Sequence, residues 1–585
     1  MKIFIDAISD IVKDAFEGLG YDRESGKVNV SNRPDLCQYQ CNGALANAKK
    51  HKKAPRVIAE EVVEKLKEND VFAKLEIAGP GFINIDVKDE FLMDYINKVN
   101  KDEKLGVSPV ENPHKIIVDY GGANVAKPLH IGHLRSAIIG ESIKRIAKYL
   151  GHEVIGDVHL GDWGLQMGMV ISEVERRHPE LPYFDDSFTG EYPKEAPFTI
   201  DELEDIYPYA SKLAKSDEKV MDAAKQATVE LQKGRRGYMA LWNHILNVSV
   251  TDLKKNYGAL NVDFELWKGE SDAQKFIPDM IKELKEKGFA YESEGALVLD
   301  VSKEDDKSPI PPLLLLKSDG ASLYGTTDLA TVVERVRDLK ADDIIYLADK
   351  RQGLHYEQFF RAAKKTSIAG DDINLNFIGF GTMNGKDGKP FKTREGGVMR
   401  LADLIGLIKE AGKEKLKDNK NIAPEDVEEI SSKVGIAALK YGDLSNQAAK
   451  DYIFDIDRFA SFEGNTGPYI LYTIVRIKSI LNKAGFDRSN SAINKPYSDV
   501  ERNLMLQIAK FNEMVELSFR ERAPHKVCEY VYDLSNIFNK FYNDTRILAE
   551  EDENKKQSWL SLINLVREVL EQSLDLLGIE TVERM

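Results

Sequence analysis

Cysteine is scarce in this chain of 585 residues, which has only Cys37, Cys41 and Cys528. Three cysteines are too few to stabilise a chain of this size with disulfide bonds, and a reducing compartment would keep them as thiols. Cys37 and Cys41 lack a second pair of Cys or His ligands nearby, which a zinc site requires, so we expect no structural metal. Their spacing predicts one face of a helix.

Long apolar runs are also missing. The longest, PIPPLLLL at residues 309–316, is far too short to cross a bilayer. The first twenty residues place apolar and charged side chains at helical spacing, whereas a signal peptide has an uninterrupted apolar block. These absences predict a soluble, cytoplasmic protein with no membrane partner.

A surplus of positive charge is absent as well, because the formal net charge is −16. Non-specific affinity for nucleic acid comes from Lys and Arg side chains that displace counterions from phosphates, so any nucleic acid must be held by local patches. Basic runs occur at residues 49–53, 233–236 and 413–420, the first of them after an expected helix that carries Tyr39. Taken alone, each run is better explained as a solvated face.

The chain is long enough for several domains. Residues 1–108 mix helical patterns with a short alternating strand and predict a small α+β domain. A catalytic domain is expected over residues 109–172 and 291–412, interrupted by a mostly helical insertion over residues 173–290. Amphipathic patterns over residues 413–585 predict a C-terminal all-α helical bundle.

Strand-like runs in the catalytic segments alternate with helical patterns. They lie at residues 115–120, 154–158, 295–300, 344–347 and 376–380. This alternation predicts an α/β fold, a Rossmann-like doubly wound parallel sheet. After the first strand, residues 121–124 are expected to turn toward a helix that reaches Leu150, which is the strand–loop–helix opening of a nucleotide site.

The sharpest chemical signal is HIGH at residues 130–133, at the start of that helix. Two imidazoles three residues apart lie on one helix face, near an N-terminus that attracts phosphate, so both can donate to ATP. Gly132 lets the adenine ring lie directly on the backbone, and Lys127 adds a cation. Such a site suits nucleotidyl transfer, in which a carboxylate attacks the α-phosphate of ATP. The alternative is a pair of capping or core histidines.

Several blocks resemble one enzyme family. Residues 123–141, ANVAKPLHIGHLRSAIIGE, look like the ATP-binding signature of class I aminoacyl-tRNA synthetases in the form that arginyl-tRNA synthetases carry. Residues 441–477 resemble the same family's junction between its catalytic and anticodon domains. Further matching blocks are NRPDLCQYQCNGALANAKK, AGPGFINIDV, HLGDWGLQ, YDLSNIFNKFYND and LLGIETVERM. They stand in the family's order over essentially the whole chain.

The resemblance implies roles for individual positions. A guanidinium has five donors in a rigid fork, so a pocket for arginine needs carboxylate and carbonyl acceptors. The implied arginine contacts are Asp119, Asn124, His159, Tyr324, Asp328 and Gln352, of which Tyr324 and Asp328 flank the guanidinium. The implied ATP contacts are Ala123, Asn124, Lys127, Pro128, His130, Gly132, His133, His355 and Lys389. Without the family register, each lone Asp or Tyr also fits a cap or a core edge.

The second class I signature is degenerate in this chain. Residues 388–397, GKPFKTREGG, lack the usual Met-Ser-Lys-Ser core, a departure that many arginine-specific members share. The flanking glycines still permit a mobile loop that closes on phosphate. We expect Lys392 and Arg394 to be catalytic together with His130, His133 and Lys127, which lies where such family members have a compensating lysine.

The resemblance implies a two-step reaction. Arginine and ATP, with Mg²⁺ but no tightly bound cofactor, give arginyl-adenylate, and the 2′-hydroxyl of the terminal tRNA adenosine then takes the arginyl group. The N-terminal domain would touch the tRNA elbow and the bundle would read the anticodon, in a monomer. The expected tRNA contacts are Tyr39, Lys49, Lys50, Tyr469 and Tyr472. Packing in the core is the alternative for each tyrosine.

Three other functions compete with this one. A class I synthetase for cysteine would show a cluster of zinc ligands, and the sequence has none. A small-molecule nucleotidyltransferase would not need the N-terminal domain or the helical tail. A catalytically dead RNA-binding paralogue would have lost His130 or His133, and both are present.

Overall fold

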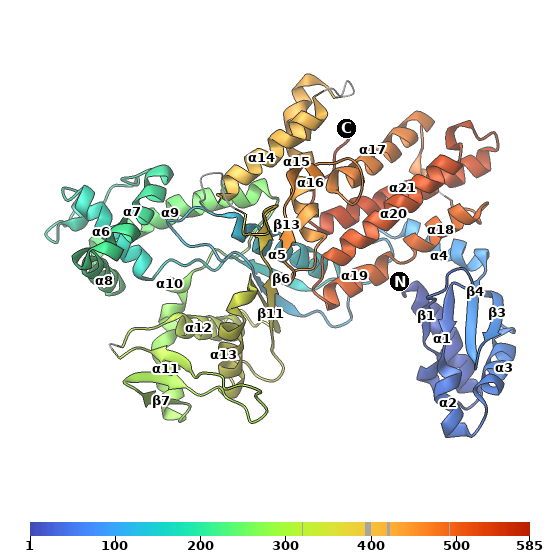
Figure 1. Ribbon diagram of the computed structural model, residues 1–585, viewed down its shortest axis with the longest axis horizontal. Coiled ribbons are helices and arrows are strands. Elements are labelled where there is room, and N and C mark those ends of the chain that lie inside the picture. The colour runs from blue at the N-terminus through green and yellow to red at the C-terminus, as the bar shows by residue number, and fades with distance from the viewer. Residues whose placement is uncertain (319, 392–398, 418–421, 491) are drawn as a thin grey trace.

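The computed structural model describes residues 1–318, 320–391, 399–417, 422–490 and 492–585 (Figure 1). The N-terminal part is an antiparallel sheet in the order β1-β2-β4-β3, packed with helices. Its elements are α1 (Phe4–Gly18), β1 (Val28–Val30), β2 (Tyr39–Cys41), α2 (Gly43–His51), α3 (Pro55–Leu66), β3 (Phe72–Ala78), β4 (Phe82–Val87) and α4 (Asp89–Lys101).

Two expectations for this region are wrong. Tyr39 and Cys41 lie on strand β2, and Cys37 lies in the loop before it, so the cysteines do not share a helix face. In a strand, side chains two residues apart point to the same side, and here both Tyr39 and Cys41 enter the core while Gln40 between them does not. The helix begins only at Gly43.

The central sheet is parallel, in the order β11-β10-β5-β6, and it confirms the predicted fold class. Its strands are β5 (Lys115–Asp119), β6 (Glu153–Asp157), β10 (Asp343–Asp349) and β11 (Asn374–Phe380), with α5 (Ile131–Tyr149), α12 (Tyr324–Arg337) and α13 (Gly353–Lys365) between them. The chain winds from β5 to β6 on one side and returns to β10 on the other. A ligand crevice is expected at this reversal, beyond the carboxyl ends of β5 and β10.

One predicted strand belongs to a different sheet. Residues 295–300 were expected in the parallel sheet, but β8 (Ala296–Leu299) pairs antiparallel with β7 (Ala290–Ser293) and β9 (Leu313–Leu316). The reason is the turn between β7 and β8, where Glu294 and Gly295 both have positive φ, 49° and 81°. Two such residues make a tight hairpin, which joins neighbouring antiparallel strands.

The insertion and the C-terminal region are helical. Figure 1 shows α6 to α9 projecting from the central sheet on one side and the C-terminal helices covering the other. The insertion has α6 (Leu165–Arg177), α7 (Ile200–Ser216), α8 (Glu218–Gln232), α9 (Arg236–Ala259), α10 (Glu270–Ala273) and α11 (Ile277–Glu286). None of the helices in the described part of the chain has the length and apolarity that crossing a bilayer demands.

The C-terminal helices share one hydrophobic core with α5 and with the N-terminal domain. They include α15 (Val427–Leu444), whose side chains are buried along most of its length. The other elements from β12 onward are β12 (Met383–Asn384), α14 (Leu401–Leu416), β13 (Tyr452–Ile453), α16 (Ile456–Phe459), α17 (Gly467–Ala484), α18 (Asp499–Ile508), α19 (Phe511–Arg520), α20 (His525–Asp544) and α21 (Glu553–Leu576).

Candidate active site

Three charged side chains meet at the carboxyl ends of β5 and β6. Asp119 ends β5, Asp157 ends β6, and Arg335 reaches both from the last turn of α12. The Nη2 atom of Arg335 donates to Oδ2 of Asp119 at 2.6 Å and to Oδ2 of Asp157 at 2.7 Å. The Arg335 side chain is 1% exposed, so these charges interact with little solvent screening. Burial raises the pKa of Asp119, and Arg335 opposes that rise.

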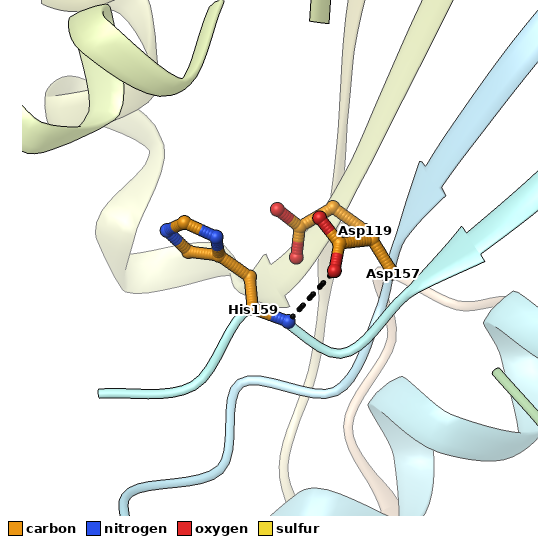
Figure 2. Close-up of side chains that lie close together, drawn as sticks. All are labelled: Asp119, Asp157 and His159. Carbon is orange, nitrogen blue, oxygen red and sulfur yellow. Dashed lines mark hydrogen bonds between the residues drawn. The ribbon is translucent and has the colours of Figure 1, made fainter. Parts of the chain in front are cut away.

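His159 stands beside the two carboxylates (Figure 2). Its backbone has a φ of +43°, and its N–H donates to Oδ1 of Asp157 at 3.3 Å. Both ring nitrogens are buried and lack a hydrogen-bond partner among the described residues. The potential ligand atoms of Asp119, Asp157 and His159 lie within 4.8 Å of one another. However, both carboxylates already pair with the guanidinium of Arg335, and this positive charge would repel a divalent cation.

The two signature histidines cap helix α5. His130 is the N-cap residue, and its Nδ1 accepts a hydrogen bond from Gly132 N at 3.0 Å. The Nδ1 of His133 accepts from His130 N at 3.1 Å. The capping alternative therefore holds, and it does not exclude the catalytic one. Because Nδ1 of each ring accepts, Nε2 carries the proton and can donate to a phosphate.

The histidines are neutral rather than cationic. Burial, together with the neighbouring His130 and Lys127, lowers the pKa of His133 to about 3. Partial enclosure of the His130 ring lowers its pKa, and the nearby charge of Lys127 adds to this effect. The centroids of the two imidazole rings lie 4.0 Å apart, and His130 is exposed at the helix N-terminus. The site therefore offers phosphate neutral N–H donors and the positive end of a helix.

The loop between β5 and α5 runs to His130, and the helix starts at Ile131, within the HIGH string as expected. Ala123 and Asn124 run beside the loop after β6. The Gly161 N–H donates to Ala123 O at 3.0 Å, and a Cβ on Gly161 would come within 2.4 Å of Asn124 Oδ1. A side chain at position 161 would therefore displace the Asn124 side chain. Pro128 is partly buried, and the Lys127 ammonium lies 4.5 Å from the ring centroid of Tyr207 on α7.

The first turn of α5 also holds the segment that carries the second signature. Arg135 Nη1 donates to Gly381 O at 2.7 Å, ahead of that segment. Beyond it, Ile131 N donates to Met399 O at 3.1 Å, and Leu401 N to Leu129 O at 2.8 Å. The start of α5 thus contacts the chain on both sides of this segment, through the Arg135 side chain on one side and through the backbone on the other. Lys389 is exposed, while Lys392 and Arg394 lie outside the described residues.

Three of the predicted arginine-binding residues, Tyr324, Asp328 and Gln352, lie at the starts of two helices. Tyr324 and Asp328 are one turn apart at the beginning of α12, and Tyr324 is 72% exposed. His355 was expected at the adenosine, but here its Nε2 contacts Oδ2 of Asp328. Gln352 is exposed in the 3-10 turn Lys350–Gln352 that leads into α13. The structure thus links His355 to the pocket predicted for arginine.

Glu270, which no sequence motif singled out, lies near Asp328 and His159. Burial raises its pKa to about 7, with Asp162 and Asp328 adding to the rise and His159 opposing it. Its backbone is held at the start of α10, where Asp162 accepts from Ser271 N at 2.9 Å and from Ser271 Oγ at 2.6 Å. In the sequence Glu270 lies in the string WKGESDA of the insertion, and nothing in this string indicates that Glu270 lies beside the sheet.

The candidate tRNA-binding residues differ in accessibility. Tyr39 is 6% exposed and packs near Phe4, so it cannot stack on an RNA base and its prediction is corrected. Lys49 and Lys50 are exposed on the last turn of α2. On α17, Tyr469 is half-buried and its OH donates to Asn536, whereas Tyr472 is 41% exposed beside Arg476.

In two of the three basic runs, some of the cationic side chains already form ion pairs or hydrogen bonds within the protein. Lys53 donates to Glu61, Arg235 pairs with Asp186, and Arg236 donates to backbone carbonyls. Residues 418–420 of the third run lie outside the described part of the chain. These bonded cations are not free to neutralise phosphates.

Family models cover most of the chain. The model for tRNA synthetases class I (R), catalytic domain, matches residues 95–456. The arginyl tRNA synthetase N terminal domain matches residues 2–87, and the DALR anticodon binding domain matches residues 470–585. The first of these alone spans more than half of the sequence.

Whole proteins match over their full length. The chain is 64% identical over 588 residues to an arginine–tRNA ligase of Alkaliphilus oremlandii and 58% identical over 599 residues to that of Agathobacter rectalis, with 100% of each chain covered. Its structure resembles the arginyl-tRNA synthetase of Plasmodium falciparum with a TM-score of 0.82 at 26% identity, covering 100% of both chains. The Thermus thermophilus enzyme, at 22% identity and a TM-score of 0.78, has the same fold over 100% of both chains. The chain belongs to the arginyl-tRNA synthetase family of class I aminoacyl-tRNA synthetases.

Proposed function

We propose that this chain ligates L-arginine to the tRNA for arginine in two steps, as part of cytoplasmic translation. ATP and arginine first give arginyl-adenylate and pyrophosphate, and the 2′-hydroxyl of the terminal tRNA adenosine then accepts the arginyl group. The proposal is supported by two acidic side chains, Asp328 and Glu270, which lie near each other and near His159 and would form an acidic pocket, and by the histidine-capped start of helix α5. Such a pocket suits a guanidinium beside a bound nucleotide.

ATP is placed over the start of α5. His130 and His133 donate from Nε2 to its phosphates, and Gly132, which is exposed, leaves room for adenine on the backbone. Lys127 and Lys389 add positive charge, and Mg²⁺ enters with ATP as part of the substrate. Lys392 and Arg394 are proposed to meet the pyrophosphate. Ala123, Asn124 and Pro128 line the same loop.

Arginine is placed between the strand ends and α12. Tyr324, Asp328 and Glu270 surround the guanidinium, while Asp119 and Asn124 hold the α-amino and carboxylate ends. Gln352 and His159 complete the pocket, and His355 leaves Asp328 when the guanidinium arrives. Two carboxylates around one guanidinium supply the planar acceptors that its five donors require.

The tRNA is proposed to lie along exposed parts of the N-terminal domain and the bundle. Lys49 and Lys50 offer charge to its backbone, and Tyr472 offers a ring to an unpaired base. We take the active species to be a monomer, because all proposed contacts come from one chain.

The test is arginine-dependent exchange of pyrophosphate into ATP, run with and without the cognate tRNA. Exchange in either condition that requires arginine supports the proposal. Absence of exchange in both conditions, while tRNA still binds, would favour a catalytically dead RNA-binding protein. Strict dependence on tRNA would show that activation requires the second substrate.

The Asp328→Ala variant tests the arginine pocket. It should lose arginine-dependent exchange by at least a hundredfold, because the removed carboxylate leaves guanidinium donors unpaired at a cost of about 3–5 kcal/mol. ATP binding, measured by fluorescence of a nucleotide analogue, should stay within about twofold of the wild type. Unchanged arginine kinetics in this variant would contradict the assigned pocket.

A further inference from the structure

A buried guanidinium lies under the arginine pocket and belongs to the protein itself. Arg335 stands two helical turns after Asp328 on α12, so both side chains project from the same face of the helix. Its Nη2 bridges Asp119 and Asp157, and its Cζ lies 5.1 Å from the ring centroid of Tyr346 on β10. Nε and Nη1 find no partner among the described residues.

Such a cluster is not explained by stability alone. A buried ion pair is often no more stabilising than apolar side chains of the same volume, because desolvation offsets the attraction. Here the cluster also leaves two guanidinium nitrogens without a hydrogen bond, which adds a further cost. The arrangement therefore favours a role in binding rather than in folding.

The charges of the cluster do not cancel. Two carboxylates and one guanidinium leave a net charge of about −1. The Asp119 side chain is 13% exposed and the Asp157 side chain 3%, so the excess negative charge is accessible at Asp119. Arg335 uses Oδ2 of Asp119, and no described residue donates a hydrogen bond to Oδ1. One carboxylate oxygen is therefore available for a cation that enters the pocket.

We propose that Arg335 is a positioning residue for the substrate: it neutralises Asp157 and turns a charged Asp119 toward the α-ammonium group of arginine. The proposal rests on the function proposed above and adds the device that keeps its ammonium site charged. Without Arg335, two carboxylates within 4.8 Å of each other would share a buried site. One of them would then take up a proton, because two like charges at this distance cannot both stay ionised.

The groups that face Asp119 come from four elements. They are Arg335 on α12, Asp157 and His159 at the end of β6, Tyr346 on β10 and Tyr356 on α13. Burial raises the pKa of both tyrosines far above neutral pH, so they stay uncharged. Arg335 is the one permanent positive charge in this set, and its removal should raise the pKa of Asp119.

The experiment compares Arg335→Met with the wild type by the KM for L-arginine in tRNA charging, from pH 6.5 to 8.5 at saturating ATP and tRNA. A protonated Asp119 no longer attracts the ammonium group, so KM should exceed the wild-type value at least tenfold at pH 7. The ratio of the two KM values should fall as pH rises and Asp119 regains its charge. kcat should stay within about threefold.

Two further variants separate charge from structure. Arg335→Met/Asp157→Asn removes the competing carboxylate, so most of the KM loss at pH 7 should be recovered. Arg337→Met makes the same change on the same helix at a side chain that is 53% exposed and pairs with Glu283, and it should behave as the wild type. A purely structural role for Arg335 predicts instead a KM rise that follows the loss of thermal stability and does not change with pH.

Each outcome supports or contradicts the proposed positioning role of Arg335. A KM ratio independent of pH, or a double variant no better than Arg335→Met, overturns the inference. If Arg335→Met fails to fold by circular dichroism, Arg335→Lys replaces it: a smaller KM rise with the wild-type pH profile supports the inference, and a steeper profile overturns it. Loss of arginine-dependent charging in the wild type and in Arg337→Met would instead refute the proposed function.

Discussion

Glu270 places a titrating group in the pocket at neutral pH. Its pKa of about 7 means that it is half protonated there, and only the ionised form attracts a guanidinium. A cation that binds beside it therefore displaces a proton. We expect the KM for arginine to fall by about tenfold between pH 6 and pH 8, since that is the ratio of ionised fractions for one group with this pKa.

The control is Glu270→Gln, measured by tRNA charging over the same pH range. This variant keeps the shape of the side chain and removes its titration, so KM should be high at every pH and lose most of its slope. A slope equal to the wild-type slope would assign the titration to another group.

At this scale the sequence identified residues that belong to a contiguous motif. His130 and His133 stand in a string whose spacing fits their chemistry, whereas Tyr324 and Asp328 are assigned through the family resemblance. Glu270 and Arg335 belong to no such motif, because one lies in a charged insertion and the other reads as the polar face of a helix. Their position depends on long-range packing, namely the cap that Asp162 forms on α10 and the approach of α12 to the ends of β5 and β6.

Helix α5 is tied to α15 by a buried ion pair. Arg135 Nε donates to Asp443 Oδ2 at 3.0 Å, with 1% and 0% of these side chains exposed. Removal of one partner leaves a buried charge uncompensated, at a cost of about 3–5 kcal/mol. We expect Arg135→Met to lower the apparent melting temperature by several degrees in differential scanning fluorimetry. It should also reduce arginine-dependent pyrophosphate exchange, because the carbonyl of Gly381 loses its hydrogen-bond donor.

The matched variant is Arg135→Met/Asp443→Leu, in which both charges are gone. It should be more stable than Arg135→Met, because no unpaired charge remains. Its exchange activity should nevertheless stay low, since the hydrogen bond to Gly381 is still missing. Equal melting temperatures for the two variants would show that the ion pair is not what the single change disrupts.

Elements were predictable where local pattern and tertiary environment agree. The inner parallel strands, β5 and β10, are buried on both faces and read as apolar runs, which the sequence makes plain. β8 has the same pattern, yet a two-residue turn at Glu294 and Gly295 pairs it with β7. β2 is three residues long, too short for its alternation to outweigh the helical pattern that follows. The predicted segment boundaries stay predictions.

The N-terminal domain docks on the C-terminal bundle through α4, as Figure 1 shows at the lower right. Arg502 on α18 donates to Asp89 Oδ1 and to Val87 O, both at 2.6 Å, and Asn97 exchanges two hydrogen bonds with the backbone of Ile493. A groove of about 1080 Å³ runs along this junction, away from the catalytic centre. The junction therefore sets the angle between the two regions proposed to hold the tRNA.

We expect Arg502→Ala to loosen this junction. The lost charged hydrogen bonds are worth about 1.5–3 kcal/mol, so amide exchange in α4 should accelerate by roughly tenfold or more in mass spectrometry. The KM for tRNA should rise, while the KM for arginine should not change because the pocket lies elsewhere.

Lys495→Ala serves as the control for the same interface. Lys495 pairs with Glu90 in a contact whose two side chains are 56% and 58% exposed, and such pairs contribute little. Amide hydrogen exchange in α4 should therefore proceed at the wild-type rate. Equal acceleration in both variants would mean that the junction responds to any loss of charge.

The segment that carries the second signature is attached to the start of α5 on both sides, at Gly381 and at Met399, which bears on how this enzyme family can diverge. Arg135 binds the first attachment point and the backbone of Leu129 and Ile131 binds the second, so these contacts come from outside the segment. Insertions, deletions and substitutions between the two attachment points can therefore accumulate without moving His130 or His133. A degenerate second signature is then compatible with an intact first one.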